Sequence, residues 1–346
     1  MKAAFYNTFQ GIISIGTLPD PEPTLRGVVI QLAASGLCLS DWHGWMGHDP
    51  DIRLPHVPGH ELAGTIVEIG KEVRNFAIGD RVTVPFVCGC GICEFCLEGD
   101  HQVCDRQFQP GFTAWGSFAQ YVAIDYADIN LVHLPTHIDS VSAAALGCRF
   151  ITAYRAVRDQ GRLKRGQTLA VHGCGGVGLS AIQIAKALGA IVIAIDRSKE
   201  KCAFAKKMGA DFVIDASKSD VIEEVRDYSR GGVHLSVDAI GHRETCLNSI
   251  LSLRKRGKHV QVGLMAGDHA SLPLPMPLII AHELEIFGSH GMQAHNYPRM
   301  FSLIDKGGIN LEAMVGLRIP LGKVPQLLPK MDVVKETGIT VIDSFE

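Results

Sequence analysis

The sequence predicts an α/β protein that joins a doubly wound parallel sheet to a second, mainly antiparallel and partly barrelled β domain. Between residues 168 and 290, short apolar runs alternate with segments of helical spacing, which is typical of right-handed strand–helix–strand crossovers. The first 149 residues differ, because they are rich in glycine, proline and short β-branched runs and contain few helical windows. A chain of 346 residues is long enough for two domains of ordinary size.

The individual elements follow from these patterns. In the β domain, the strand-like runs include GVVIQLAASG (27–36), LAGTIVEIG (62–70) and DRVTVPFV (80–87). In the parallel-sheet domain, TLAVHG is a short buried-strand pattern, and LSAIQIAKALGA has helical spacing with a glycine near its end. The expected strands there are 168–173, 191–196, 211–217, 234–241, 258–264 and 284–289, and the expected helices are 179–190, 199–210, 221–232 and 244–257.

The expected domain boundaries follow the change of pattern. We expect the β domain over 1–149 and the parallel-sheet domain over 150–289. The last segment, 290–346, contains one or two short helices and two strands, which is too little for a third domain. We therefore expect this segment to return to the first domain.

Composition excludes several classes of protein. The chain is 47% hydrophobic and 20% charged, with a net charge of −3, so nothing indicates a nucleic-acid partner or a polybasic membrane surface. The first twenty residues lack a charged segment followed by a long apolar core, so we expect no signal peptide. The most apolar stretch (272–287) contains three prolines and two glutamates, which argues against a membrane-spanning helix. These observations predict a cytoplasmic protein with no membrane partner.

Five of the ten cysteines lie within seventeen residues. The cytoplasm keeps thiols reduced, which disfavours disulfides. Cys88, Cys93 and Cys96 reproduce the C-x4-C-x2-C start of a plant-type iron–sulfur site, but that motif needs a distant fourth cysteine. Spacers of two, two and seven residues separate a different set, which suits a closed tetrahedral zinc site: Cys90, Cys93, Cys96 and Cys104. Spacing alone favours structural zinc and leaves iron–sulfur and incidental thiols as alternatives.

A glycine-rich turn lies between the first strand and first helix of the parallel-sheet domain. There, Gly173 allows a tight turn, Gly175 allows close approach to a pyrophosphate, and Gly178 allows close helix–strand packing. Asp196 ends the next strand, where an acidic residue binds the adenosine ribose and repels a 2′-phosphate, so NAD is favoured over NADP. The neighbouring Arg197 keeps NADP open as the alternative. The residues expected at the pyrophosphate are Gly173, Gly175, Gly176, Val177 and Gly178.

Three further segments contain residues that bind metals: SGLCLSDWHGWMG (35–47), HVPGHELAGTIVEIG (56–70) and ALGCRFITAYRA (145–156). Each is ambiguous alone, because a single cysteine or histidine is most often a packed or hydrogen-bonded core residue. Together with the cysteine cluster and the glycine turn, they make the chain resemble the zinc-dependent alcohol dehydrogenases of the medium-chain dehydrogenase/reductase family, over nearly its whole length. The resemblance implies a Rossmann cofactor domain, a GroES-like catalytic domain, and reversible hydride transfer between an alcohol and NAD+.

The resemblance assigns two zinc ions per chain. Cys38, His60 and Cys148 match the catalytic zinc ligands, and two thiolates with one imidazole leave a fourth position open. The four-cysteine set matches the structural zinc lobe at about 88–104, which leaves Cys88 as an extra cysteine.

Four more residues match catalytic positions. Glu61 is expected close behind the metal, and Asp41 is expected to fix the tautomer of His60. Ser40 and His43 match a relay that carries the alcohol proton to solvent, although a turn serine and a surface histidine are the simpler interpretations.

The resemblance also implies cofactor-binding and substrate-binding positions, for which the residues themselves give less support. Thr152 matches a position beside the nicotinamide, and Lys201 matches a lysine that reaches the adenosine ribose. The substrate pocket is expected to be hydrophobic and to be lined by Phe86, Phe118 and Trp45.

The chain also departs from the family at two positions. Leu39 and Ile339 stand where relatives often have basic residues near the pyrophosphate. We therefore expect weaker NAD+ binding and easier cofactor release.

Other functions remain as alternatives. Polyol and threonine dehydrogenases of the family carry glutamate at the third ligand position, whereas this chain has Cys148, which favours simple alcohols. A polyol or specialised-metabolite dehydrogenase is one alternative, and a non-catalytic NAD-binding protein is another. The expected partners are a small alcohol, aldehyde or ketone and further copies of the chain, as a dimer or tetramer that pairs strands at LEIFGSHG (284–291).

Overall fold

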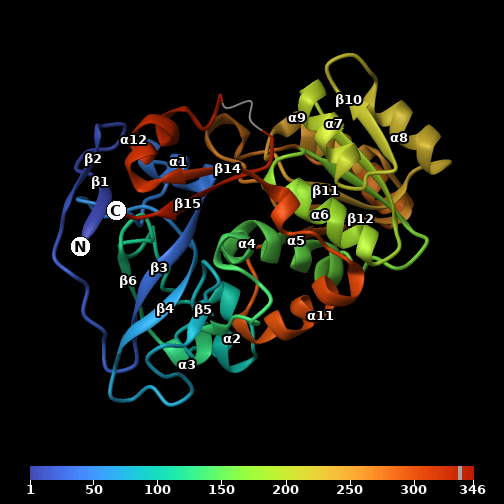
Figure 1. The fold of residues 1–346 in the computed structure, drawn as a ribbon. Coiled ribbons are helices and arrows are strands. Elements are labelled where there is room, and N and C mark those ends of the chain that lie inside the picture. Colours follow the sequence, from blue (N-terminus) through green and yellow to red (C-terminus); the bar gives the residue numbers. More distant parts are fainter. Residues whose placement is uncertain (334–336) are drawn as a thin grey trace. The chain divides into compact units, whose positions relative to one another are not determined.

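The chain folds into two compact units in a computed structural model that describes residues 1–333 and 337–346. Figure 1 shows its helices and strands coloured along the sequence. Unit 1 consists of Met1–Ile151, Gly291–Pro298 and Val315–Glu346. Unit 2 consists of Thr152–His290 and Arg299–Met314.

Unit 1 is built on a mainly antiparallel sheet in the order β14-β15-β3-β4-β5-β7, with β6 paired to β3; only β14 and β15 run parallel. A separate antiparallel pair is formed by β1 and β2. The strands are β1 (Lys2–Tyr6), β2 (Ile13–Thr17), β3 (Val28–Leu37), β4 (Glu61–Ile69), β5 (Arg81–Thr83), β6 (Tyr121–Ile124), β7 (Val132–His133), β14 (Val315–Pro320) and β15 (Ile339–Ser344). The helices are α1 (Leu39–Met46), α2 (Glu94–Leu97), α3 (Ala127–Asn130), α4 (Ser140–Ala144) and α12 (Val324–Leu327).

Strand β3 organises this unit, because it pairs with β4, β6 and β15. Its sequence is nearly all apolar, and eight of its ten residues are buried. The core on which it packs includes Ile30, Leu62, Ile66 and Phe118. A rigid, buried strand thus leads directly to Cys38.

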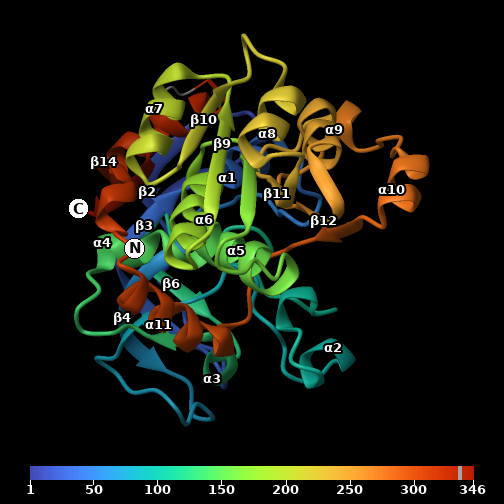
Figure 2. The same cartoon turned by 90° about the vertical axis from the view of Figure 1, so that its right-hand side faces the viewer.

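Unit 2 contains a six-stranded parallel sheet in the order β10-β9-β8-β11-β12-β13, with helices packed against it (Figure 2). This is the strand order of the Rossmann fold, so the predicted doubly wound sheet is confirmed. The strands are β8 (Thr168–His172), β9 (Ile191–Asp196), β10 (Phe212–Asp215), β11 (Val233–Asp238), β12 (Leu253–Gln261) and β13 (Glu285–Gly288). The helices are α6 (Gly176–Ala187), α7 (Lys199–Lys207), α8 (Val221–Ser229), α9 (Arg243–Leu251) and α10 (Met276–His282).

Two segments differ from the sequence-based expectation. The helix expected over 244–257 ends at Leu251, and β12 begins at Leu253 because it pairs with β11 through a register shift. Residues Arg299–Met314, expected with the first domain, belong to unit 2. There, the backbone N–H of Asn310 donates to Gln183 of α6 at 3.1 Å.

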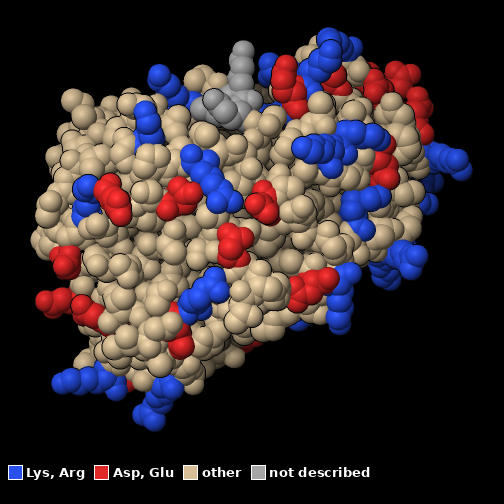
Figure 3. Space-filling model, viewed as in Figure 1, with Lys and Arg blue, Asp and Glu red and all other residues tan. Residues whose placement is uncertain are grey.

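Helices α5 (Ile151–Tyr154) and α11 (Tyr297–Gly307) contain points where the chain passes between the units. A π-helical turn over Leu146–Phe150 precedes α5. No helix in the described ranges is long and apolar enough to cross a membrane. On the face drawn in Figure 3, basic and acidic side chains are interspersed over a mostly uncharged surface.

Candidate metal centre and cofactor loop

Unit 1 brings together the three residues predicted to bind the catalytic metal. Cys38 follows β3 and precedes α1, His60 directly precedes β4, and Cys148 lies in the π-helical turn. All three are buried, and their candidate ligand atoms lie within 4.8 Å of one another.

Asp41 holds two of these segments in place. Its carboxylate accepts hydrogen bonds from Nδ1 of His60 at 2.9 Å and from the backbone N–H of Cys38 at 2.9 Å. It also accepts the N–H of Gly59 at 3.0 Å. Among the described residues, Nε2 of His60 is buried and has no hydrogen-bond partner. With Nδ1 committed to Asp41, Nε2 is the nitrogen available to a metal.

The two thiols of this site interact with each other. A hydrogen bond from Cys148 lowers the pKa of Cys38 well below its ordinary value and raises that of Cys148, with His60 and Arg149 also favouring the Cys38 thiolate. Burial alone would lower the pKa of His60, but Asp41 and Cys38 raise it well above the ordinary value. Two sulfur ligands and one imidazole around a shared point suit zinc with an open fourth position.

An ion pair that the sequence did not suggest lies beside this site. Glu61 accepts hydrogen bonds at 2.9 Å from both the backbone N–H and Nε of Arg149, and it also contacts Nη2 of Arg149. Both side chains are buried. Burial raises the pKa of Glu61, and the Arg149 guanidinium offsets part of this effect.

A second cluster contains four cysteines, and their sulfur atoms also lie within 4.8 Å of one another: Cys90, Cys93, Cys96 and Cys104. The N–H groups of Cys90 and Arg106 each donate to Sγ of Cys104 at 3.3 Å, as expected for a site that holds thiolates. Hydrogen bonds from the backbone of Cys96 and Asp105 lower the pKa of Cys93 to about 7.

Cys88 lies outside this cluster. Its Sγ donates to the carbonyl of Pro85 at 3.4 Å, and its side chain is fully buried in the core. The iron–sulfur alternative that used Cys88 is therefore wrong, and four thiolates at one point fit a closed zinc site.

The glycine turn of unit 2 joins β8 to α6. Gly173 adopts φ +99°, which favours glycine, and a side chain at Gly178 would overlap the carbonyl of Gly173. A Cβ at Gly175 would meet nothing within 4 Å, so the turn has an open side there. The carboxylate of Asp196 accepts the N–H groups of Cys174 at 2.8 Å and Ser198 at 2.9 Å.

The remaining predicted cofactor residues lie in the same unit. Gly176 and Val177 form the first turn of α6. Arg197 is exposed after β9, and Lys201 is half-buried in α7. Thr152 is buried, and its hydroxyl has no hydrogen-bond partner within the described part of the chain.

Comparison with known proteins gives consistent matches over most of the chain. Residues 25–136 match the alcohol dehydrogenase GroES-like domain, and residues 176–306 match the zinc-binding dehydrogenase domain. The chain is 33% identical over 341 residues to an NAD-dependent alcohol dehydrogenase of Sulfurisphaera tokodaii, covering 95% of this chain and 96% of the relative. It is 35% identical over 309 residues to a D-arabitol-phosphate dehydrogenase of Enterococcus avium, covering 88% and 86%. The structure of alcohol dehydrogenase TADH from Thermus sp. ATN1 is similar with a TM-score of 0.91 at 26% identity, covering 99% of this chain and 100% of that chain.

The chain belongs to the zinc-dependent alcohol dehydrogenases of the medium-chain dehydrogenase/reductase family. As a member of this family, the dehydrogenase is an oxidoreductase that acts on CH–OH groups. The family and fold predicted from the sequence are confirmed.

The predicted relay residues of the dehydrogenase both lie on α1. Ser40 lies 3.7 Å from the sulfur of Cys38, but no hydrogen bond joins Ser40 to His43 in the described structure. Nδ1 of His43 instead contacts Nδ1 of His48 at 2.9 Å, a partner that the sequence did not suggest. Burial and the neighbouring His48 lower the pKa of His43.

The aromatic residues around the dehydrogenase's metal centre differ from the expected set. Phe86 packs near the His60 ring, with centroids 6.0 Å apart, and Phe112 packs closer at 5.0 Å. Phe118 is fully buried in the β-domain core. Trp45 packs in the same core, and its Nε1 donates to the carbonyl of Gly11 at 2.9 Å. Phe118 and Trp45 thus have core contacts, and the pocket role expected for them stays a prediction, while Phe112 joins Phe86 as a candidate pocket residue.

The two departures from the family pattern have different surroundings in the dehydrogenase. Leu39 is 44% exposed at the start of α1, whereas Ile339 is buried in a small core with Ala34, Ala144 and Val341. A charged side chain at 339 would therefore replace a core contact in this chain.

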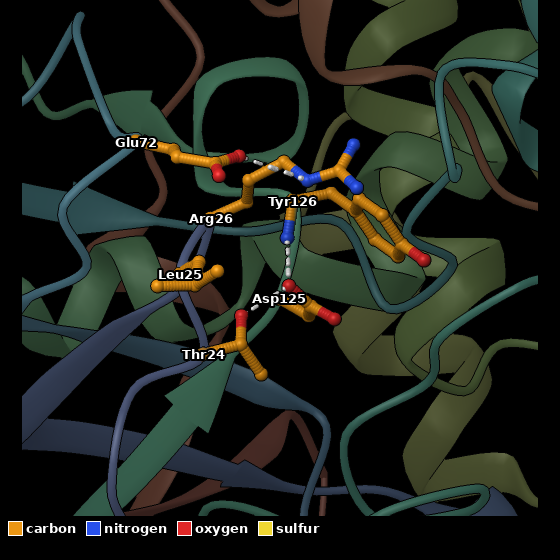
Figure 4. Close-up of a pocket in the computed structure, with 6 residues that line it drawn as sticks. All are labelled: Thr24, Leu25, Arg26, Glu72, Asp125 and Tyr126. Atoms are coloured by element: carbon orange, nitrogen blue, oxygen red, sulfur yellow. Dashed lines mark hydrogen bonds and ion pairs between the residues drawn. The ribbon is translucent and has the colours of Figure 1, made fainter.

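Figure 4 shows a surface pocket of the dehydrogenase that none of the predicted site residues lines. Its volume is about 270 Å³. Four of its polar side chains are already paired: Arg26 contacts Glu72 at 3.5 Å, and Thr24 donates to Asp125 at 2.6 Å. Arg26 also lies over the Tyr126 ring. The lining residues are Thr24, Leu25, Arg26, Glu72, Asp125 and Tyr126.

Proposed function

We propose that the dehydrogenase uses NAD+ and two zinc ions, with a catalytic ion at Cys38, His60 and Cys148 and a structural ion in the four-cysteine lobe. The observation that carries this proposal is the buried, unpartnered Nε2 of His60, on an imidazole whose candidate ligand atom lies within 4.8 Å of two thiol sulfur atoms. A buried imidazole nitrogen without a partner is costly unless a ligand satisfies it.

When bound, zinc supplies a Lewis acid with an open position and NAD+ supplies the hydride acceptor. Phe86 and Phe112 give the carbon chain of the alcohol apolar contacts beside His60. The hydroxyl of Ser40 and the imidazole of His43 carry the alcohol proton towards solvent. The contact between Nδ1 of His43 and Nδ1 of His48 supports a path by which the proton leaves on this side of α1.

In unit 2, Gly173, Gly175, Gly176, Val177 and Gly178 bind the pyrophosphate, supported by the open side of the turn at Gly175. Asp196 disfavours a 2′-phosphate, which supports NAD over NADP despite the adjacent Arg197. Lys201 reaches the adenosine ribose, and the unpartnered hydroxyl of Thr152 lies beside the nicotinamide.

Simple alcohols are the proposed substrates because the third ligand is Cys148. The similarity to a D-arabitol-phosphate dehydrogenase favours a polyol as the second candidate. We further propose a cytoplasmic homo-oligomer, a dimer or tetramer. The position of β13 at the edge of the six-stranded sheet supports pairing through this strand.

The first test combines metal analysis with turnover. The purified chain should contain two zinc ions, and NAD+ should be reduced in the presence of simple primary or secondary alcohols, followed by near-ultraviolet absorbance. Cys38→Ser should remove one zinc ion and all turnover, whereas Cys93→Ser should remove one zinc ion and leave measurable turnover. Turnover only with NADP+ would contradict the role given to Asp196. Two zinc ions without turnover on any alcohol, including polyols, would favour a specialised metabolite or a non-catalytic role.

A further inference from the structure

We propose that Arg149 is a positioning residue that aligns the ligands of the catalytic metal by clamping Glu61. The inference rests on the proposed zinc site, and it goes beyond that site because Arg149 is not itself a ligand. It starts from the buried ion pair between the residue after His60 and the residue after Cys148.

Three N–H donors of Arg149 bind the carboxylate of Glu61, and we call this arrangement the clamp. The backbone N–H and Nε of Arg149 both donate to Oε1 of Glu61 at 2.9 Å, and Nη2 donates to Oε2. The donating backbone N–H belongs to the peptide bond that follows Cys148. Its hydrogen bond therefore fixes the main chain at the third ligand, while Glu61 itself is fixed by β4 directly after His60.

The local helix geometry explains why this clamp is needed. Cys148 and Arg149 lie in a π-helical turn, and such wide turns are rare and are frequently found at functional sites. In this turn the amide of Arg149 is directed to Glu61, which lies 88 residues earlier in the chain. The position of Cys148 thus depends on a contact with β4 as well as on its own helix.

Strand β3 leaves space for the clamp. Gly36 pairs with Glu61 across β3 and β4, and a Cβ at Gly36 would overlap Oε2 of Glu61 and crowd Nη2 of Arg149. Buried ion pairs contribute little net stability compared with apolar packing of similar volume. This buried ion pair lies next to the ligands His60 and Cys148, and Gly36 leaves space for it. Both observations fit a role in aligning the metal site.

The experiment measures zinc release from the folded holoenzyme to a colorimetric chelator. Cys38→Ser and Cys93→Ser assign the two release phases, because each leaves a single ion. Arg149→Lys keeps the charge but loses the planar fork, so we expect catalytic-site release to become about 10–100-fold faster, with the structural phase unchanged. The double variant Glu61→Gln/Arg149→Met, which leaves no buried charge unpaired, should show the same change.

One further variant and two controls separate alignment from stability. Gly36→Ala displaces the clamp without removing any charge, and we expect faster release of the catalytic ion only. Gly322→Ala is the matched control, because a Cβ there meets nothing within 4 Å. Lys186→Met is the control for losing an ion pair elsewhere, since Lys186 pairs with Asp211 in unit 2. Both controls should release zinc as the unmodified chain does.

Two outcomes would overturn the inference. If the Arg149→Lys variant and the double variant are folded and release both zinc ions at the unchanged rate, Arg149 does not align the site. Equal acceleration of both phases would show that the pair only stabilises the fold. If the unmodified chain binds a single zinc ion, the proposed function itself fails, and this is seen before any variant is compared.

Discussion

At the scale of single residues, His43 shares a hydrogen bond with a second histidine, and this gives the proposed relay a defined pH dependence. To accept a proton during alcohol oxidation, His43 must be neutral. Burial and His48 lower its pKa from the ordinary 6.5, so neutral His43 persists into more acidic solution. We expect the acid limb of kcat/KM for alcohol oxidation to lie below pH 6.5.

Replacing His48 tests this assignment. In His48→Gln the neighbouring charge is lost, the pKa of His43 rises, and the acid limb should move to higher pH. His133→Gln, which changes an exposed histidine on β7, should leave the pH profile unchanged. A His48→Gln profile that matches the parent would remove His43 from the proton path.

Much of the site could be predicted at this scale, because cysteine spacing and the glycine turn are local patterns. Arg149, His48 and Phe112 could not be predicted, since their partners depend on which distant segments meet. Arg149 follows a predicted ligand, yet its role appears only when β4 brings Glu61 beside it. The sequence predicts Phe118 and Trp45 at the pocket but cannot distinguish an aromatic pocket wall from an aromatic core, and both residues have core contacts.

At the scale of elements, two glycines of the turn before α6 are expected to affect different properties. Gly178 should affect the stability of unit 2, and Gly175 should affect cofactor binding. Gly178→Ala would push a methyl group into the carbonyl of Gly173, so we expect it to destabilise unit 2 by about 1–3 kcal/mol. Gly175→Ala meets no protein atom within 4 Å and should leave stability unchanged. It should raise the Kd for NAD+ about tenfold or more, because the added Cβ occupies the pyrophosphate approach.

Thermal unfolding and NAD+ titration of both variants check this pair of expectations. Gly322→Ala serves as the control, since its Cβ also meets nothing within 4 Å and it lies outside the cofactor turn and β13. Equal NAD+ affinity in Gly175→Ala and the parent would place the pyrophosphate elsewhere.

The four-cysteine lobe predicts a distinct order of thiol reactivity. Cys93 has a pKa of about 7, whereas the pKa of Cys96 is raised to about 12, chiefly by burial. After zinc is removed with a chelator, iodoacetamide at pH 7.5 should therefore alkylate Cys93 before Cys96, because the thiolate is the nucleophile. Mass spectrometry of peptides gives the order. Restoring zinc should protect Cys93, and alkylation of the buried Cys88 before Cys93 would contradict the assigned lobe.

The elements of unit 2 were more predictable than those of unit 1. Strands β8, β9 and β11 are short, mostly buried runs, and each is followed by a helix. The start of β12 was missed because apolar residues continue from α9 into the strand, and only pairing with β11 decides between helix and strand. The π-helical turn around Cys148 has no sequence signature of its own.

At the scale of the whole molecule, buried neutral histidines make the free energy of unfolding depend on pH in acidic solution. Burial lowers the pKa of His259 to about 4 and that of His172 to about 3. In the unfolded chain, His259 binds a proton near pH 6.5. In the folded chain, it binds a proton only near pH 4. Stability is therefore full above pH 6.5 and falls as the pH drops towards 4, by about 2–3 kcal/mol for His259.

Urea unfolding between pH 7 and pH 4 measures this loss. His259→Gln should reduce the pH dependence, because glutamine does not titrate, and the part due to His172 should remain. His133→Gln should retain the slope of the parent. A parent whose stability is constant over this range would contradict the assignment of a neutral, buried His259.

The pairing of β15 with β3 has a consequence for synthesis of the chain on the ribosome. Residues 35–37, which lead directly to Cys38, pair with 340–342, whereas β6 pairs with an earlier part of β3 and β4 pairs with its other edge. The β15 side of residues 35–37 therefore stays unpaired until residues 340–342 have been made. At about 5–20 residues per second, that interval lasts on the order of tens of seconds. During translation, nascent chains would therefore expose this side of the backbone of residues 35–37, next to Cys38, until the residues of unit 2 have been made.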